Sequence, residues 1–468
     1  MVRTRIAPSP TGEDIHIGNL YTALINFAFA KKHDGKFIIR IEDTDRQRFQ
    51  EGAEKKILSS LKAFGLSYDE GPDIGGPFAP YRQSERLPLY KEYAEELVKK
   101  GAAYYCFCAK ERLEKLRQEQ IAAKKTPRYD KHCLHSSKDA KERIKRGDPS
   151  VIRLNVIPGK KVWFKDVIRG EISFDSRDVD DQVLLKSDGY PTYHLGVVVD
   201  DHVMEISHII RAEEWISSTP KHVLLFASFG WKEPIFAHLP ILRNPDRSKL
   251  SKRKNPVWAS WYLEQGYLPE AVLNYLALMG WSHPEQKEIF SFSEFCSLFD
   301  LKDIHPVGPV FDIQKLEWVN GMYIREVLPK EELVRRLQSF YEHDDETLEM
   351  LHHTDSHKLD LLLDIVRTRM KKLTDFKELV SAPKKEHVYE SEQVVLARSL
   401  SQKLLSIDSK NWNETVLLET LKAFSKENDS SMKIVYILLT GESQGLPLPQ
   451  FLTYLGKESS LSRLKRYF

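Results

Sequence analysis

The hydrophobic pattern near the amino end of the chain predicts alternating strands and helices. Arg3–Ala7 is a strand candidate, and the prolines and glycine of Pro8–Gly12 predict a loop. Apolar residues recur at helical spacing from His16 to Lys32, and Phe37–Ile41 is a β-branched run. A strand, a loop, a helix and a strand in this order predict a βαβ unit with a parallel sheet.

The next segments predict an insertion into this α/β pattern. A helix is predicted from Pro88 to Lys100 and a basic helix from Lys110 to Lys125, before short alternating strands within 151–187. The α/β pattern resumes over 193–230. We therefore expect an α/β nucleotide-type domain that carries an inserted α+β segment.

The carboxyl-terminal half has a helical pattern. Residues 262–281 and 330–468 are predicted as consecutive amphipathic helices, for example Leu359–Leu373 and Val394–Leu405. The longest mainly apolar stretch, near Val223–Trp231, falls far short of the roughly 18 residues that span a bilayer. We expect an all-α half and no membrane segment.

Composition narrows the class of protein. A chain of 468 residues with 41% hydrophobic and 29% charged residues is typical of a globular protein with about two to four domains. The net charge of +2 gives no global sign of nucleic-acid binding, so such a partner would have to meet local basic patches. The four cysteines do not make a disulfide scaffold, and the first residues contain no apolar signal-peptide core. We expect a cytoplasmic protein with reduced thiols.

The loop Pro8–Gly12 and the following helix start can hold phosphate. Backbone N–H groups at a helix N-terminus favour anions, and Gly18 permits close approach of a nucleotide. His16 and Asn19 can donate hydrogen bonds to oxygens that gain charge. On these residues alone, a tight turn with a surface histidine is an equal alternative.

A basic loop and a charged group are further candidates. The cations of Lys249–Arg253 can close over a triphosphate, although an isolated charge run is more often a solvated loop. Arg5, Glu42 and Arg211, with Asp200–Asp201, can form a pocket in which the arginines hold carboxylates and Glu42 holds an ammonium. Ordinary surface ion pairs are the stronger alternative from sequence alone.

The cysteines are arranged in a metal-binding pattern. Cys106 and Cys108 form one closely spaced couple, and Cys133 and His135 form a second. Four such ligands match a tetrahedral structural Zn²⁺ site with no open position for catalysis. The alternative is three buried structural cysteines, and Cys296 is expected in the core.

Taken together, these motifs resemble the bacterial-type glutamyl-tRNA synthetases, which are class I aminoacyl-tRNA synthetases. The resemblance covers essentially the whole chain. It is carried by RIAPSPTG (5–12), RIEDTDRQR (40–48), APYRQSER (79–86), PTYHL (191–195), VVDDHVMEISHIIRAEEW (198–215), KLSKR (249–253), YLALMGWS (275–282), FDIQKLEWVNGMYIRE (311–326) and LLTGESQGLPL with LGKE near the end.

The resemblance implies roles for individual residues. His16–Asn19 stands at the HIGH signature with Asn19 in place of the last histidine, and Lys249–Arg253 stands at the KMSKS signature, departing from it at Leu250 and Arg253. The implied catalytic residues are His16, Asn19, Lys249 and Lys252. The implied glutamate-binding residues are Arg5, Ala7, Ser9, Glu42, Tyr193 and Arg211. The implied ATP-binding residues are Thr11, Gly18, Glu214, Leu242, Lys249, Ser251 and Lys252.

The resemblance also implies a reaction, a fold and partners. L-Glutamate would be activated with Mg·ATP and transferred to the 2′-hydroxyl of the terminal adenosine of tRNA-Glu, with tRNA needed for the first step. The implied domains are a Rossmann-type catalytic domain at 1–104 and 191–245, an inserted zinc-containing acceptor-stem-binding domain at 105–190, the KLSKR loop with a stem-contact helical domain at 246–328, and a helical anticodon-binding domain at 329–468. A helix over Val366–Lys372, with Arg367 and Arg369, is the candidate anticodon contact, and a solvated basic face is the alternative.

Several related activities remain open from sequence. A synthetase that also charges tRNA-Gln is the nearest alternative. A truncated paralogue that glutamylates a modified base of tRNA-Asp would lack residues 330–468, and a glutaminyl enzyme would carry β-barrels there. A catalytically inactive, zinc-stabilised RNA-binding protein is the alternative of a different class. We expect a monomer.

Overall fold

The computed structural model describes residues 1–134, 137–251, 256–353, 355–381 and 391–467. The chain divides into two compact units. The first comprises Met1–Trp261 and Leu273–Asp312, and the second comprises Tyr262–Val272 and Ile313–Phe468.

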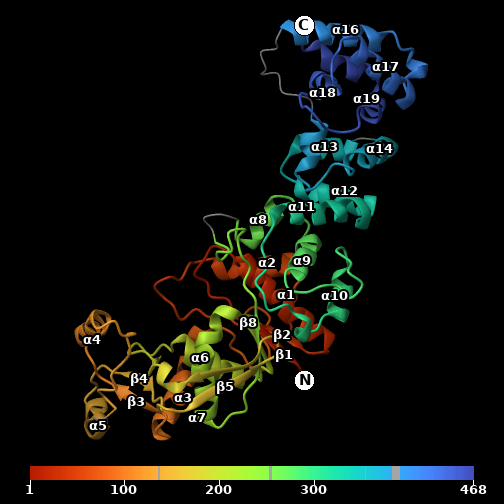
Figure 1. The fold of residues 1–468 in the computed structure, drawn as a ribbon. Coiled ribbons are helices and arrows are strands. Elements are labelled where there is room, and N and C mark those ends of the chain that lie inside the picture. Colours follow the sequence, from red (N-terminus) through yellow and green to blue (C-terminus); the bar gives the residue numbers. More distant parts are fainter. Residues whose placement is uncertain (135–136, 252–255, 354, 382–390, 468) are drawn as a thin grey trace. The chain divides into compact units, whose positions relative to one another are not determined.

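The first unit begins with the predicted βαβ arrangement (Figure 1). β1 (Arg3–Ile6) pairs in parallel with β2 (Lys36–Ile39), and α1 (Ile17–Lys32) connects them. β8 (His208–Ala212) pairs in parallel with β9 (Ile235–Leu239). The backbone N–H of Ser207 donates to the carbonyl of Arg3 (3.0 Å), which brings the start of β8 beside β1. The residues that follow β1, β2 and β8 can therefore meet at one edge.

The predicted insertion contains two strand systems. β3 (Ala103–Cys106), β4 (Val151–Leu154) and β7 (Val183–Leu185) form an antiparallel sheet. The hairpin of β5 (Lys161–Asp166) and β6 (Gly170–Asp175) joins the other sheet, in the order β6-β5-β9-β8. A hairpin expected within the insertion thus extends the sheet that carries β8.

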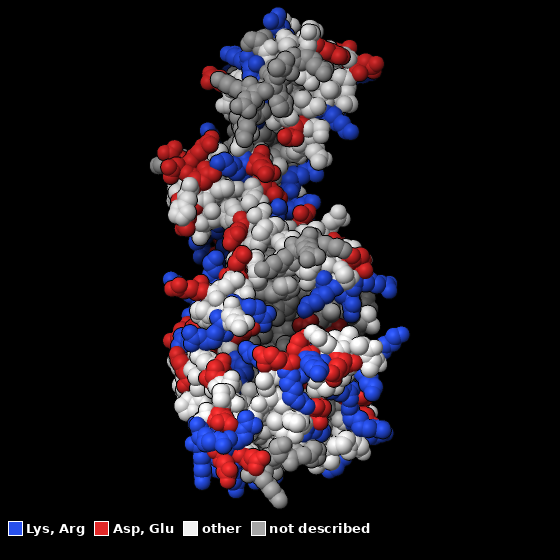
Figure 2. Space-filling model, turned by 90° about the vertical axis from the view of Figure 1, so that its left-hand side faces the viewer, with Lys and Arg blue, Asp and Glu red and all other residues white. Residues whose placement is uncertain are grey.

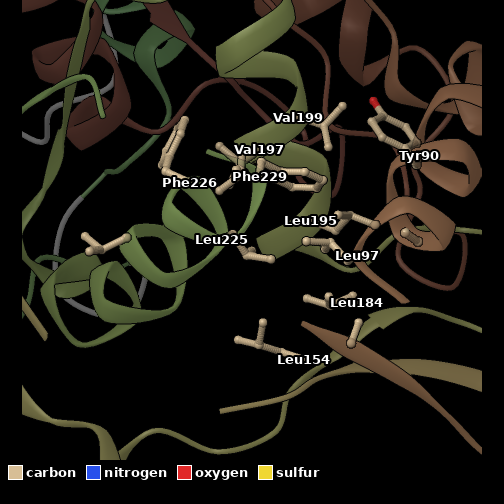
Figure 3. Close-up of a cluster of buried hydrophobic side chains, with 14 of the residues drawn as sticks. Tyr90, Leu97, Leu154, Leu184, Leu195, Val197, Val199, Leu225, Phe226 and Phe229 are labelled. Atoms are coloured by element: carbon tan, nitrogen blue, oxygen red, sulfur yellow. The ribbon is translucent and has the colours of Figure 1, made fainter. Parts of the chain in front are cut away.

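A hydrophobic core lies beneath these sheets (Figure 3). It joins side chains of α3 (Leu87–Lys99), α6 (Tyr193–Val203) and α7 (Thr219–Phe229) to those of β4 and β7. Leu97, Leu195 and Phe226 are among its fully buried members. Burial of this apolar surface fixes the helices against the strands and so positions the loops at the strand ends.

Helices form the remainder of the structure. The first unit also contains α2 (Ala53–Ala63), α4 (Lys110–Ala122), α5 (Ser137–Lys145) and α10 (Phe292–Leu298), and the division between units falls within α8 (Ala259–Glu264) and α9 (Pro269–Leu278). The second unit contains α11 (Ile313–Met322), α12 (Lys330–Phe340), α13 (Asp345–His353), α14 (Ser356–Val366), α15 (Asp375–Val380), α16 (Ser391–Leu405), α17 (Glu414–Glu427), α18 (Met432–Thr440) and α19 (Leu448–Lys465). Within the described ranges no strand follows β9, so the predicted helical half is confirmed.

One helix prediction is wrong. The sequence predicts a helix through Leu373 that includes Val366–Lys372, but α14 ends at Val366. The backbone N–H of Leu373 instead donates to the carbonyl of Gly266 (2.9 Å), and Asp375 accepts the backbone N–H of Lys371 (2.7 Å). These bonds replace the helical ones, so the candidate anticodon segment is a turn rather than a helix.

The distribution of charged side chains on the surface agrees with the net charge of +2, which is close to zero. On the face shown in Figure 2, acidic and basic side chains are interspersed. Over the described residues, no helix combines the length and the apolar character needed to cross a membrane.

Candidate active site

Helix α1 begins at Ile17, where the sequence predicts a helix start. His16 is the N-cap residue, and its Nδ1 accepts the backbone N–H of Gly18 (3.0 Å). In the neutral ring the proton therefore lies on Nε2, which can donate to a ligand. Gly18 is half-buried and Asn19 is exposed in the first turn of the helix.

The indole of Trp258 packs against the loop that precedes this helix. A Cβ added to Gly12 would lie 2.6 Å from Cη2 of Trp258, so the close approach requires glycine. The backbone N–H of Ile17 donates to the carbonyl of Val257 (2.7 Å). The segment that follows the KLSKR motif is thereby fixed to the start of α1.

The KLSKR motif begins in a short hairpin. The N–H of Leu250 donates to the carbonyl of Leu242 (3.1 Å), and both side chains are buried. This arrangement places Lys249 at the surface, where its Nζ lies 2.6 Å from a carboxylate oxygen of Glu214. Ser251 is exposed, and Lys252 lies outside the described residues.

A buried ion-pair network underlies the predicted amino-acid pocket. Arg5 in β1 contacts both carboxylate oxygens of Asp201 (3.0 and 3.1 Å), and Arg40 reaches the same carboxylate at 2.8 Å. Arg40 also approaches Asp200 (3.5 Å) and Glu42 (3.3 Å). Each arginine thus compensates a buried carboxylate that would otherwise be costly to bury.

Glu42 differs from the other carboxylates of this network. Burial raises its pKa to about 7, although Arg40 and Arg5 oppose this increase. The backbone N–H of Glu42 donates to the carbonyl of Pro8 (3.0 Å), so the main chain at Glu42 lies beside the loop after β1. The side chain can therefore exist with or without charge near neutral pH.

Arg211 in β8 is buried among neutral groups. Its guanidinium donates to Nε2 of His238 (3.2 Å), the hydroxyls of Tyr193 (3.2 Å) and Thr219 (2.8 Å), and Nδ1 of His222 (3.2 Å). Among the described residues no carboxylate forms an ion pair with it. This buried cation is therefore suited to a carboxylate of a ligand.

Three thiols form a separate cluster at the end of β3 and in the loops that carry Cys108 and Cys133. The Sγ atoms of Cys106, Cys108 and Cys133 all lie within 4.8 Å of one another. The Tyr129 hydroxyl is 3.3 Å from the sulfurs of Cys106 and Cys108. The predicted fourth ligand, His135, lies outside the described residues. Three soft ligands at this spacing fit a tetrahedral zinc ion.

The remaining predicted site residues lie in two parts of the structure, the loop after β1 and the second unit. Ala7, Ser9 and Thr11 lie in the loop after β1, where the N–H of Thr11 donates to the carbonyl of Ser9 (2.9 Å). Arg367 and Arg369 belong to the second unit.

Of the groups that accept hydrogen bonds from Arg211, sequence reasoning identified Tyr193 and missed His238, Thr219 and His222. His238 interrupts the apolar run of β9, and that interruption is the one signal in the sequence that could have identified it. Thr219 and His222 lie in α7 among apolar residues and gave a weaker signal. Asp166 and Tyr129 gave none, because only the fold brings them to their partners.

Comparison with known proteins gives two family matches. Residues 1–318 match the class I tRNA synthetase (E and Q) catalytic domain, and residues 332–468 match an anticodon-binding domain. The chain is 46% identical to a glutamate–tRNA ligase of Thermus thermophilus, with 100% of this chain and 99% of that protein covered. It is 43% identical to one of Acidothermus cellulolyticus, with 99% and 95% covered.

A solved structure agrees with these matches. The crystal structure of a glutamate tRNA ligase from Elizabethkingia meningosepticum in complex with its amino acid superposes with a TM-score of 0.84 at 33% identity, covering 100% of this chain and 99% of that one. The family match spans the segments that contain His16, Glu42 and Arg211. The chain therefore belongs to the class I tRNA synthetase family of the E and Q enzymes.

Proposed function

We propose that this chain is a glutamate–tRNA ligase, which forms glutamyl-adenylate from L-glutamate and ATP and transfers the glutamyl group to tRNA-Glu. The observation that carries the proposal is the buried Arg211 guanidinium, which, within the described part of the chain, donates its hydrogen bonds to neutral groups only. Its charge remains for a substrate carboxylate, and Glu42 can accept the substrate ammonium. The names of the full-length relatives support this assignment.

In the first step the α-carboxylate of glutamate attacks the α-phosphorus of ATP and pyrophosphate leaves. The N-terminus of α1, with Nε2 of His16 and Asn19, would stabilise charge that develops on the phosphate oxygens. Lys249 and Lys252 would neutralise the departing pyrophosphate, and Thr11, Gly18, Glu214, Leu242 and Ser251 would line the ATP site. Mg²⁺ bound to ATP supplies further charge neutralisation.

In the second step the 2′-hydroxyl of the terminal adenosine of tRNA attacks the mixed anhydride and AMP leaves. We assign residues 105–190 to the acceptor end and 329–468 to the anticodon, with 1–104, 191–245 and 246–328 as the remaining domains. The match of residues 332–468 to an anticodon-binding domain supports this division. The alternative is an enzyme that also charges tRNA-Gln. We expect the protein to be a cytoplasmic monomer.

We also assign one structural Zn²⁺ to the sulfur cluster. Cys106, Cys108 and Cys133 would act as thiolate ligands, and the fourth ligand would be His135 or the hydroxyl of Tyr129. The ion would connect the end of β3 to the loop that carries Cys133, and it would hold no substrate.

ATP–pyrophosphate exchange with tRNA present tests the proposed function. We expect exchange with glutamate and none with glutamine, because the amide brings no charge to Arg211. Arg211→Gln should raise the KM for glutamate by about 100-fold or more while the KM for ATP stays within about twofold. No exchange at saturating glutamate would contradict the proposal and favour an inactive RNA-binding protein.

A further inference from the structure

The Arg211 guanidinium is held by uncharged acceptors from several elements. Nε donates to His238 of β9, one terminal nitrogen donates to Tyr193 and His222, and the other donates to Thr219. Guanidinium has five N–H donors in a rigid plane, so bonds in several directions fix its orientation.

Asp166 determines which nitrogen of His238 accepts this bond. One carboxylate oxygen of Asp166 lies 2.7 Å from Nδ1 of His238 and accepts the backbone N–H of the same residue (3.0 Å). The proton therefore lies on Nδ1, and Nε2 presents a lone pair to Arg211. The other oxygen of Asp166 accepts the backbone N–H groups of Ile168 and Arg169 (both 3.0 Å), so Asp166 is fully engaged away from Arg211.

His222 accepts a second hydrogen bond from the Arg211 guanidinium. Nδ1 of His222 accepts from Arg211, so its proton lies on Nε2 and donates to Nδ1 of His194 (3.1 Å). Burial, followed by repulsion from neighbouring cations, lowers the pKa of His222 and lowers that of His194 to about 3. Burial likewise lowers the pKa of His238, although Asp166 opposes the shift. The three imidazoles are therefore uncharged near neutral pH.

Because its hydrogen-bond partners are neutral, Arg211 can bind an anionic ligand differently from the other buried arginines, Arg5 and Arg40. Arg5 and Arg40 each contact the carboxylate of Asp201, so an anionic ligand would share their charge with that group. Arg211 has no such competitor among the described residues. A carboxylate that binds Arg211 gains a charge-assisted bond without displacing an internal ion pair.

We infer that His238, with its tautomer fixed by Asp166, and His222 are positioning residues that orient Arg211 through neutral acceptors and so leave its charge for the carboxylate of the substrate. The inference rests on the proposed function, because it assumes that Arg211 binds glutamate. It extends the amino-acid site beyond the residues that touch substrate. Strand β5 of the hairpin also contributes to the orientation of Arg211, because it supplies Asp166.

Steady-state pyrophosphate exchange on the full chain, with tRNA present, tests this role. His238→Leu keeps bulk but removes the acceptor, and we expect the KM for glutamate to rise about 10- to 100-fold while the KM for ATP stays within about twofold. His238→Gln retains an acceptor and should recover the KM to within about fivefold of the parent value. Asp166→Asn should shift the KM in the same direction as His238→Leu, because the amide cannot fix the tautomer as well.

His283→Leu is the matched control. His283 is also buried, and its Nε2 lies 3.1 Å from Glu294, but it makes no hydrogen bond to Arg211. We expect no selective change in the KM for glutamate. If His238→Leu shifted the KM values for glutamate and ATP alike, or left both unchanged, the positioning role would be overturned.

A double-mutant cycle gives an independent test. In an Arg211→Lys background, His238→Leu should change the KM for glutamate by less than about twofold, because its effect acts through the guanidinium. Additive effects would contradict the inference. An inactive parent enzyme would instead contradict the proposed function, so the two failures are distinguishable.

Discussion

Glu42 gives the amino-acid site a pH dependence. Its carboxyl has a pKa of about 7 because burial outweighs the influence of Arg40 and Arg5, while Asp201 adds to the increase. The group is protonated below this pKa and then offers no charge to a substrate ammonium. We expect kcat/KM for glutamate to fall about tenfold per pH unit below pH 7, since this parameter reports the free enzyme.

The variant Glu42→Gln separates this group from the others that titrate. We expect a lower kcat/KM for glutamate above pH 7 and loss of the inflection near pH 7, because the amide carries no charge at any pH. Measuring kcat/KM for ATP at saturating glutamate provides the control. An unchanged glutamate profile in Glu42→Gln would exclude Glu42 as the group that titrates.

At the residue scale, chemical type could be read from sequence but hydrogen-bond partners could not. Arg5, Glu42 and Arg211 are charged residues that the pattern placed at strand ends, and the structure confirms those places. The acceptors of Arg211 come from β9 and α7, far along the chain. Their roles depend on tertiary packing, which no local pattern encodes.

Among the elements, α14 shows where helical periodicity misleads. Arg367 stands where the predicted helix would continue, but its guanidinium donates to the carbonyls of Ile324 (3.1 Å), Leu328 (3.3 Å) and Arg325. Ile324 and Arg325 belong to a π-helical turn, Tyr323–Val327, and Leu328 follows it. Tertiary bonds to these groups and to the backbone of 371–373 end the helix, and the periodic pattern does not show them.

The two candidate anticodon arginines should therefore behave differently. Arg367→Ala should lower the free energy of unfolding by about 1–3 kcal/mol, because three carbonyls lose a charged donor. Arg369 is exposed, so Arg369→Ala should change stability by less than about 0.5 kcal/mol. We expect Arg369→Ala to weaken tRNA binding and reduce its salt dependence.

Urea unfolding and tRNA titration at several salt concentrations measure these effects. The two variants serve as controls for each other, since both remove one arginine from the same turn. Equal stability of Arg367→Ala and the parent would contradict the structural role. Unaltered tRNA affinity in Arg369→Ala would favour the alternative of a solvated basic face.

The zinc assignment concerns the end of β3 and the two loops that carry Cys108 and Cys133. We expect about one zinc per chain after purification without chelator, and loss of the ion in Cys108→Ser, because three ligands bind weakly. Cys296→Ser is the matched control, since Cys296 lies outside the cluster and should leave the zinc content unchanged. Elemental analysis measures the stoichiometry.

Two outcomes refine or overturn the assignment. Less than about half an equivalent of zinc in the parent protein would contradict a four-ligand site. Full zinc content in Tyr129→Phe would identify His135 as the fourth ligand, whereas loss of zinc would favour the hydroxyl that lies beside two of the sulfurs.

For the whole molecule, the sequence predicted the order of α/β and helical parts well because each has a distinct hydrophobic period. It did not predict that β5 would pair with β9, because the two strands lie far apart in the chain. The pairing is made at Asp166↔Phe236. The connection matters because Asp166 then lies beside His238. Long-range pairing of this kind is where local patterns carry least information.

The catalytic and anticodon-binding matches together predict how the full chain should discriminate between tRNAs. Chemistry is assigned to residues in 1–318 and base reading to 332–468, so a change in the anticodon should alter tRNA binding, while glutamate activation at saturating tRNA should stay the same. Replacing one anticodon base of tRNA-Glu should raise the KM for tRNA about 5- to 100-fold, the value of one stacked or edge-bonded base. The KM for glutamate should stay unchanged.

Aminoacylation with radiolabelled glutamate measures this, with tRNA-Glu, its anticodon variants, tRNA-Gln and an acceptor-stem minihelix assayed side by side. Charging of tRNA-Glu alone identifies a discriminating synthetase, and charging of tRNA-Gln as well identifies the relaxed form. A minihelix that is charged as efficiently as full tRNA-Glu would contradict anticodon reading, because the minihelix has no anticodon. Phosphate contacts would then supply the affinity.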